Sequence, residues 1–203
     1  VAEMARGVER NPEAMIWLAR LRSTDQYSYD HALDVSVHLM VFARFLGLSA
    51  KVVEQVGIAG LMQDIGKIDI PAEILNKPGD LTAKECQLVQ SHVASSLEML
   101  LGQATFPNHV LEIVASHHER ADGSGYPRRK TLDQIPLSAR IVGVADVYDA
   151  LISRRVYKSP IPHAAAVDMI LADRGRRFDP AVTDAFAAEA ATFAGIAARY
   201  RDE

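Results

Sequence analysis

Histidines and aspartates occur in this chain at positions where a helical protein normally places apolar residues. Asp64 directly follows the apolar run VGIAGLM, and Asp146 lies within ARIVGVADVYDAL. A carboxylate buried among such neighbours is costly unless it is paired or bound to a metal ion. His117 and His118 are adjacent at an expected helix end, where neighbouring side chains can converge once the chain leaves the helix. These residues predict metal ligands.

The joint pattern is stronger than any single residue in it. His92 taken alone is more often a satisfied polar residue than a ligand, and His38, His109 and His163 are interpreted as ordinary polar residues of their helices. Mixed histidine and aspartate ligands suit iron, manganese or zinc better than calcium. A ferritin-like di-iron bundle is excluded, because no glutamate is followed by a histidine three residues later.

The elements that must position these residues are all predicted to be helices, because apolar residues recur every three or four positions. We therefore expect an all-α fold. Helices are expected over residues 12–22, 29–46, 50–63, 83–101, 107–118 and 137–152, with two more beginning near residues 162 and 180. His31 would lie in the first turn of the second helix, and His92 in the middle of the fourth.

Local signals set several of these boundaries. Ser49 is typical of a helix N-cap, and Thr82 followed by Glu85 predicts a capping box. Residues 65–80 carry Pro71, Pro78 and Gly79, so we expect a loop with one short helical turn over 72–75. Residues 119–136 form the longest expected loop, and loops of that length are usually functional or disordered.

The composition describes one ordinary domain. Of 203 residues, 49% are hydrophobic, which is enough for a core, and the net charge of −4 argues against a duplex nucleic acid partner. A single cysteine cannot form an intrachain disulfide, and we expect a cytoplasmic protein without membrane insertion. Because the chain begins with Val1, we expect a piece of a longer protein, with a helical lead-in over 1–28 and the main domain over 29–203.

Four strings in this order resemble the HD-GYP family, a branch of the HD metal-dependent phosphohydrolases: QDIGKIDIP, LNKPGDLT, SHHERADGSGYP and RIVGVADVYDAL. The resemblance runs from about His31 to Pro180, and the string from His117 to Pro127 is specific to this branch. It implies an all-α HD-domain helical bundle with a metal site between helices. It also implies hydrolysis of the bacterial second messenger cyclic di-GMP to linear pGpG or to GMP.

The resemblance also implies two divalent metal ions that share Asp64. Iron or manganese is favoured, with zinc, nickel or magnesium as alternatives. One ion would be held by Asp64, His92, His117 and His118, and the other by His31, Gln63, Asp64 and Asp146. Gln63 stands where the family has the histidine of the HD pair, and an amide oxygen is a weaker ligand than imidazole. We therefore expect the site with Gln63 to fill partially or with a different ion, and Tyr27, in place of a glutamate, to leave no third metal.

Further site residues follow from the resemblance, each with an ordinary structural alternative. Lys67 would act with Asp64 in catalysis by reaching a phosphate or the bridging hydroxide; otherwise it is a surface lysine. Arg155 and Lys158 would hold substrate phosphates, or form a solvated basic loop. Tyr126 would lie near the nucleotide, or pack an exposed turn. The set is completed by two acids expected to orient the histidines, Glu119 and Asp122, whereas the basic runs 128–130 and 174–177 are interpreted as solvated surface.

Two functions remain open at this stage. The first is a cyclic di-GMP phosphodiesterase with a weakened metal site and reduced activity. The second is a catalytically silent module that binds nucleotide or partner proteins. These partners include diguanylate cyclase domains, bound through the GYP loop, which is the loop over 119–136 that contains Gly125, Tyr126 and Pro127. Hydrolysis of another phosphodiester is a weaker third possibility.

Overall fold

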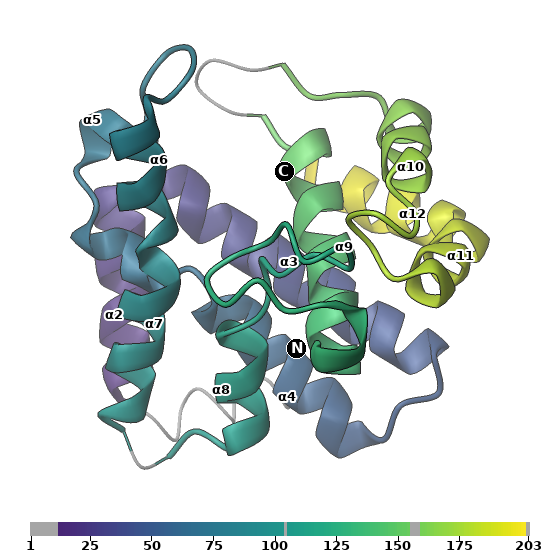
Figure 1. Ribbon diagram of the computed structural model, residues 1–203, viewed down its shortest axis with the longest axis horizontal. Helices are drawn as coiled ribbons and strands as arrows, with labels where there is room; N and C mark the ends of the chain where they lie inside the picture. Colours follow the sequence, from purple (N-terminus) through teal and green to yellow (C-terminus); the bar gives the residue numbers. More distant parts are fainter. Residues whose placement is uncertain (1–11, 104, 155–158, 202–203) are drawn as a thin grey trace.

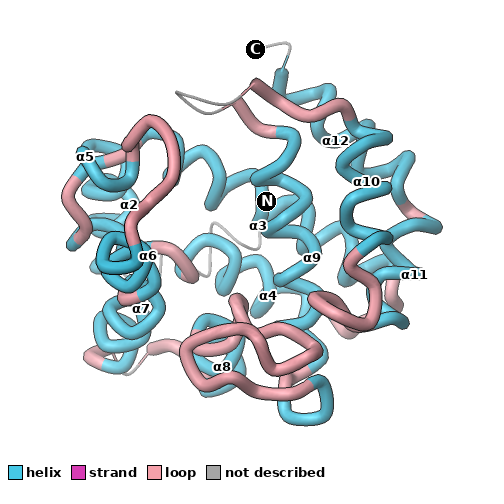
Figure 2. Tube along the Cα trace, turned by 45° about the horizontal axis from the view of Figure 1, so that its top comes forward, coloured by secondary structure: helices cyan, strands magenta, loops and turns pink. Residues whose placement is uncertain are grey.

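The computed structural model describes residues 12–103, 105–154 and 159–201, which form helices joined by loops (Figure 2). Within these ranges, β pairing is confined to two isolated bridges, Asp122 with Thr131 and Arg174 with Phe178. The all-α prediction is confirmed. The elements are α2 (Pro12–Thr24), α3 (Gln26–Phe45), α4 (Ala50–Met62), the 3-10 helix η1 (Ile65–Asp69), α5 (Ala72–Leu75), α6 (Ala83–Gln90), α7 (His92–Leu101), α8 (Asn108–Val114), the 3-10 helix η2 (Leu132–Gln134), α9 (Leu137–Ile152), α10 (His163–Ala172), α11 (Pro180–Ala188) and α12 (Ala190–Arg201).

Helix α3 lies across the middle of the molecule and packs against both α4 and α9. Figure 1 shows α5, α6 and α7 on one side of α3, and α10, α11 and α12 on the other. The hydroxyl of Ser36 donates to the carbonyl oxygen of Gly57 at 2.8 Å, which ties α3 directly to the backbone of α4. Helix α4 is buried from Val56 to Met62, so the residues that follow it, Gln63 and Asp64, enter the interior.

Aromatic rings fasten the C-terminal helices to this centre. Phe193 of α12 lies 5.4 Å from Phe42 of α3 and 5.2 Å from Tyr148 of α9 between ring centroids, and Phe186 of α11 packs against all three rings. His38 stacks on Phe193 at 5.2 Å, with the two rings nearly parallel. His38 is therefore a packing residue outside the ligand cluster, as the sequence predicted. Unlike an ordinary polar residue, it is buried with neither ring nitrogen hydrogen-bonded among the described residues.

The other two histidines given an ordinary role have one polar partner each. His109 pairs with the hydroxyl of Ser138 at 2.9 Å, and His163 pairs with the hydroxyl of Tyr148 at the same distance. Both contacts join neighbouring helices, and neither histidine belongs to the His and Asp cluster described below.

Local capping signals are confirmed where the sequence predicted them. The Ser49 side chain accepts from the Val52 N–H at the start of α4, and Thr82 with Glu85 forms a full capping box at the start of α6. The short turn expected over residues 72–75 is α5, and α9 spans its predicted range of 137–152. In these places a few neighbouring residues decide the conformation.

Three boundaries differ from the prediction. The helix expected over 83–101 is interrupted at Ser91, whose hydroxyl donates to the Leu88 carbonyl at 2.7 Å and competes with the helical bonding pattern. His92 therefore begins α7 rather than lying in mid-helix. Helix α3 begins earlier than expected, capped by Asp25, so His31 lies in its second turn. The expected boundary between residues 28 and 29 consequently falls inside α3.

Three further differences concern the segment after α8, residues 65–69 and the C-terminal segment. Helix α8 ends at Val114, and the next residues form a tight turn in which the Ser116 N–H bonds to the Ile113 carbonyl. Residues 65–69, expected as loop, form η1, and the C-terminal segment is divided at Glu189 into α11 and α12.

Among the described helices, none has both the length and the apolar character that crossing a bilayer requires.

The Glu85 carboxylate at the capping box gives a test of this fold. It accepts from Lys77 Nζ at 2.7 Å and from the Thr82 N–H at 2.7 Å, and these bonds lower its pKa from 4.5 to about 2. A carboxyl whose folded pKa is depressed stabilises the fold above its unfolded pKa, and this stabilisation is lost as pH falls toward the folded pKa. Glu85→Gln should therefore lower the thermal midpoint at neutral pH, and its difference from the parent should shrink between pH 4.5 and about 2.

The matched control is Glu98→Gln, because Glu98 is exposed on α7. Thermal midpoints are measured by circular dichroism across the pH series for both variants and the parent. A Glu85→Gln difference that stays constant down to about pH 2 would show that the carboxylate charge does not stabilise this corner of the fold.

Candidate metal centre

The imidazoles of His92 and His117 are fixed in one tautomer by backbone carbonyls. His92 Nδ1 lies 2.6 Å from the Val89 carbonyl oxygen, and His117 Nδ1 lies 2.7 Å from that of Val114. A carbonyl oxygen only accepts, so each Nδ1 carries the proton and each Nε2 presents a lone pair. The two Nε2 atoms face each other at 3.4 Å. Two buried lone pairs at this distance create a site for a shared cation.

Asp64 stands between two groups of potential ligands. Its Oδ1 lies 3.1 Å from His92 Nε2 and 3.9 Å from His117 Nε2, whereas its Oδ2 lies 3.8 Å from His31 Nε2 and 2.7 Å from Lys67 Nζ. Burial alone would raise the pKa of Asp64, but the Lys67 ammonium holds it well below its ordinary value. Asp64 is therefore ionised, with one oxygen directed toward each group.

His31 is held between two aspartates of α9. Its Nδ1 lies 2.6 Å from Asp149 Oδ2, and its Nε2 lies 3.0 Å from Asp146 Oδ1. Burial alone would lower the pKa of His31, but the hydrogen bonds to Asp146 and Asp149 raise it to about 10. His31 is therefore protonated, and its positive charge neutralises the carboxylates of Asp146 and Asp149. A metal ion bound beside Asp146 would supply positive charge at the same place.

His118 completes the first group from the turn after α8. Its ring centroid lies 4.0 Å from that of His117 and 4.8 Å from that of Tyr126. Burial lowers the pKa of His117 to about 4 and that of His118 well below its ordinary value. Both imidazoles are therefore neutral near pH 7, which is the form that binds metal ions.

The sequence-predicted ligands converge into two sets with Asp64 in common. In each set, one potential ligand atom per residue lies within 4.8 Å of those of the others; the sets are Asp64, His92, His117, His118 and His31, Asp64, Asp146. The residues come from α3, α9, the end of α4, the start of α7 and the turn after α8, so segments far apart in the sequence deliver them. Imidazole and carboxylate donors in these numbers suit a transition metal.

Gln63 lies inside the second set. Its Nε2 donates to Asp146 Oδ1 at 3.0 Å, and its backbone carbonyl accepts from the Ser96 hydroxyl at 2.9 Å. Its side-chain oxygen Oε1 is fully buried and has no hydrogen-bond partner among the described residues. A buried acceptor without a partner costs free energy, and a cation beside it would remove that cost. The residues present thus fit a divalent ion in both sets, with Gln63 as the weaker donor.

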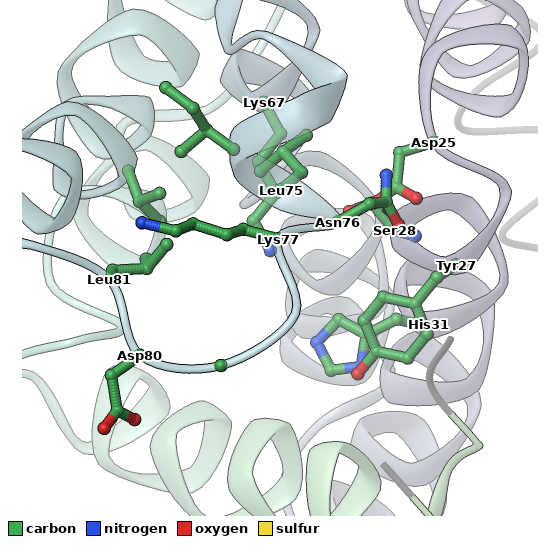
Figure 3. A pocket seen from close by; sticks show the side chains of 13 residues that line it. Asp25, Tyr27, Ser28, His31, Lys67, Leu75, Asn76, Lys77, Asp80 and Leu81 are labelled. Atoms are coloured by element: carbon green, nitrogen blue, oxygen red, sulfur yellow. Dashed lines mark hydrogen bonds between the residues drawn. The ribbon is translucent and has the colours of Figure 1, made fainter. Parts of the chain in front are cut away.

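A pocket of about 440 Å³ opens beside His31, between the start of α3, η1 and the loop over residues 76–81. Figure 3 shows the Tyr27 ring over the His31 imidazole, with centroids 5.8 Å apart and planes 13° from parallel. Lys67 lines the same pocket, and its ammonium is bound to Asp64. The pocket thus gives a ligand access to the second set.

Glu119 and Asp122 were expected to orient the histidines, but their carboxylates bind backbone N–H groups instead. Both Glu119 oxygens accept from backbone N–H groups of the GYP loop, those of Arg128 at 2.7 Å and Lys130 at 2.9 Å. Asp122 accepts from the Ser124 N–H within an exposed turn. In the described structure these acids shape the loop, whereas Asp149, Val89 and Val114 hold the imidazoles. The expected phosphate ligands Arg155 and Lys158 lie outside the described residues.

Two motif glycines are required by close packing around the ligands. A Cβ on Gly66 would lie 2.3 Å from the His92 carbonyl oxygen, and one on Gly125 would lie 2.4 Å from the Arg120 nitrogen. Any larger residue at Gly66 would push η1 away from α7 and separate Asp64 from His92. The glycine of the GYP string likewise keeps Tyr126 against His118.

Asp149 is the site residue that sequence reasoning missed. It is 1% exposed and binds His31, while Ser153 donates to the same oxygen at 3.2 Å. The available signal was its spacing, because Asp146 and Asp149 are three positions apart and so share one face of a helix. The backbone acceptors for His92 and His117 had no signal in residue type.

A family model described as HD domain matches residues 9–182. A cyclic di-GMP phosphodiesterase of Pseudomonas aeruginosa is 41% identical over 186 residues, which cover 92% of this chain and 45% of the relative. A cyclic di-GMP phosphodiesterase response regulator of Xanthomonas campestris is 41% identical, covering 91% and 50%. A 3'3'-cGAMP-specific phosphodiesterase of Vibrio cholerae is 37% identical, covering 76% and 30%. The chain spans about half the length of the first two relatives.

Solved structures show the same fold at lower identity. A protein of Bdellovibrio bacteriovorus described as HDG"Y"P gives a TM-score of 0.65 at 21% identity, covering 78% of this chain and 50% of that one. The HD domain of the Listeria monocytogenes phosphodiesterase PgpH gives 0.65 at 16% identity, covering 89% and 98%. These similarities confirm the helical architecture.

The role of Asp149 as the acceptor for His31 can be tested by Asp149→Asn, which keeps the shape and removes the charge. We expect the affinity of the second set for Mn²⁺ to fall roughly 10- to 100-fold, as for other groups that orient a metal-binding histidine. The set containing His92 and His117 should bind as before. Mn²⁺ binding is measured by calorimetric titration, with Asp168→Asn on the exposed side of α10 as the control. Unchanged affinity at both sets would contradict this role.

Proposed function

This chain belongs to the HD-GYP branch of the HD domain family, and from that premise we propose that it hydrolyses cyclic di-GMP to linear pGpG or to GMP. The observation that carries the proposal is the shared position of Asp64 between two sets of ligand atoms. Relatives at 41% identity that are described as cyclic di-GMP phosphodiesterases support it. Hydrolysis adds water across a P–O bond: the water oxygen joins phosphorus, and a proton goes to the departing ribose 3' oxygen.

Two divalent ions would be held by the two sets, with Asp64 common to both. When bound, such a pair supplies positive charge to the phosphoryl oxygens and makes a water molecule acidic enough to attack. We propose iron or manganese, because neutral imidazoles dominate the first set. Zinc, nickel and magnesium are the alternatives to be compared in the same binding assay.

Residues beside the ligands would orient the substrate. Lys67 reaches from η1 to Asp64 and lines the 440 Å³ pocket, so its ammonium is positioned to balance phosphate charge as well as that of Asp64. Tyr126 presents its ring next to His118, where it can contact a nucleotide. Arg155 and Lys158 remain proposed phosphate ligands because they occupy the corresponding positions in the family motif.

The second candidate is a silent module that binds cyclic di-GMP or a diguanylate cyclase domain through the GYP loop. One contact favours it: the Gln63 amide donates to Asp146 Oδ1, so that oxygen is already bonded without a cation. A metal ion in this set must displace that hydrogen bond or leave the amide in place. This competition is the physical reason to expect weaker binding in the second set.

The decisive comparison is the parent against Gln63→His. The parent should hold one ion tightly and a second one weakly, and it should turn over cyclic di-GMP when manganese is supplied in excess. Gln63→His should bind two ions tightly and turn over faster at limiting metal, because imidazole replaces a weak amide ligand. Metal content is measured by inductively coupled plasma mass spectrometry and turnover by chromatography of the products.

Asp64→Asn is the negative control, because it removes the charge that both ions share; it should lose both the ions and the turnover. Two tightly held ions of one kind in the parent would contradict the reasoning about Gln63. Absence of turnover in both the parent and Gln63→His, with both ions bound, would refute the hydrolase and favour the binding module.

A further inference from the structure

The arginines on one side of the metal centre differ in their partners. Arg140 pairs with Asp179 at 3.0 Å, Arg174 pairs with Asp184 at 2.7 Å, and Arg176 pairs with Asp173. Arg120 and Arg177 have no ion pair among the described residues. The run 174–177, interpreted from the sequence as uniformly solvated surface, thus contains one arginine of a different kind.

Arg120 and Arg177 line the same pocket, a cavity of about 160 Å³ next to the metal ligands. Its wall also includes His118, Asp146 and Tyr126. The cavity is smaller than the 440 Å³ pocket beside His31, and it has room for a phosphate group but not for a nucleoside. Two arginines therefore line one small cavity that adjoins a member of each ligand set, His118 and Asp146.

The backbone holds the two arginines in place. The Ala121 N–H donates to the Arg177 carbonyl at 3.1 Å, which joins the loop over 173–178 to the start of the GYP loop. The Arg177 guanidinium lies 5.4 Å from the centroid of the Phe178 ring, and Phe178 is buried. The 173–178 loop is closed by bonds from Phe178 N to Asp173 O and from Gly175 N to Phe178 O. The site is therefore built before any ligand arrives.

Two carboxylates, Glu119 and Asp146, also line this pocket, but neither forms an ion pair with Arg120 or Arg177 among the described residues. Glu119 already accepts from the backbone N–H groups of Arg128 and Lys130. Arg177 is half-buried, and burial together with the neighbouring Arg120 charge lowers its pKa, while Asp146 and Asp173 act in the opposite direction without pairing with it. Asp146 is already bonded to His31 and Gln63. Like charges held together at a partly desolvated site repel, and an anion between them relieves the repulsion. Guanidinium groups are the side chains best shaped to bind phosphate oxygens.

We propose that Arg120 and Arg177 together bind a phosphate group of the dinucleotide whose reacting phosphodiester lies at the adjoining ligand sets. The identity of the ligand as a cyclic dinucleotide rests on the proposed function. The inference that the site binds a phosphate anion rests on the two arginines alone. The pair would fix the sugar-phosphate ring against the centre from the side of the 160 Å³ cavity. Arg177 would act as a substrate-positioning residue.

The anion site can be tested without substrate. Inorganic phosphate is titrated into the protein with a chelator present, so that bound metal ions do not compete for it, and arginine Nε–Hε signals are followed by NMR. Signals of Arg120 and Arg177 should shift together and saturate, whereas those of Arg174 and Arg176 should stay in place. Arg177→Gln should weaken phosphate binding by roughly tenfold or more, the usual effect of removing a charged hydrogen-bond donor.

The matched control is Arg176→Gln, the exposed neighbour with its own aspartate, which should bind phosphate like the parent. Circular dichroism checks that the variants fold, and Arg120→Gln replaces Arg177→Gln if the latter does not. Shifts that grow without saturation at all four arginines would overturn the proposal. So would phosphate affinity that is the same in the parent and in the variant with either pocket arginine replaced.

A second arm separates this inference from the proposed function. Cyclic di-GMP binding to the metal-loaded protein is measured by calorimetry for the parent, Arg177→Gln and Arg176→Gln, and we expect a weakening of tenfold or more only in Arg177→Gln. Phosphate binding at the pair without any cyclic di-GMP binding would refute the substrate and leave the anion site standing. Normal cyclic di-GMP binding by Arg177→Gln would refute the positioning role and leave the substrate standing.

Discussion

The arrangement of this protein depends on one constraint: neutral imidazoles and ionised carboxylates must be brought together in the interior without water to solvate them. His92 and His117 direct lone pairs at each other across 3.4 Å, and Asp64 brings a negative charge to the same place. Such a cluster is unfavourable unless a cation or proton is shared within it. Lys67 and the proton on His31 supply positive charge to the carboxylates. The helices, glycines and backbone carbonyls around the cluster are arranged to hold it.

The fold meets this constraint by delivering four of the six ligands from helix ends or turns, whereas His31 and Asp146 project from within α3 and α9. Helix α4 is apolar along most of its length and ends where Asp64 is needed, while the break at Ser91 places His92 at the start of α7. The tight turn after α8 lets two adjacent histidines converge. Gly66 allows η1 to lie against α7 closely enough for the two groups to meet. Local backbone irregularities thus occur where the chemistry requires them.

What could be predicted from the sequence is what local residues decide. Ser49 and Thr82 cap their helices through neighbours within three positions, and the ligand types could be identified from motifs that keep their residues together. What could not be predicted depends on which distant segments meet. Asp149 becomes a partner of His31 only because α9 lies beside α3. Arg177 differs from Arg176 because it lines the cavity beside His118 and Asp146, whereas Arg176 pairs with Asp173. The partners of the Glu119 carboxylate were not predicted for the same reason: they are backbone N–H groups of Arg128 and Lys130, which the fold of the loop brings to it.

The account is tested most directly by anomalous X-ray diffraction from crystals of the protein soaked in manganese, recorded with a wavelength chosen for that metal. It predicts two anomalous peaks, one on each side of the Asp64 carboxylate, with the stronger one among His92, His117 and His118 and the weaker one beside Gln63. Peaks absent from both sides of Asp64, with manganese bound only to surface carboxylates, would contradict the claim that these buried side chains exist to share cations.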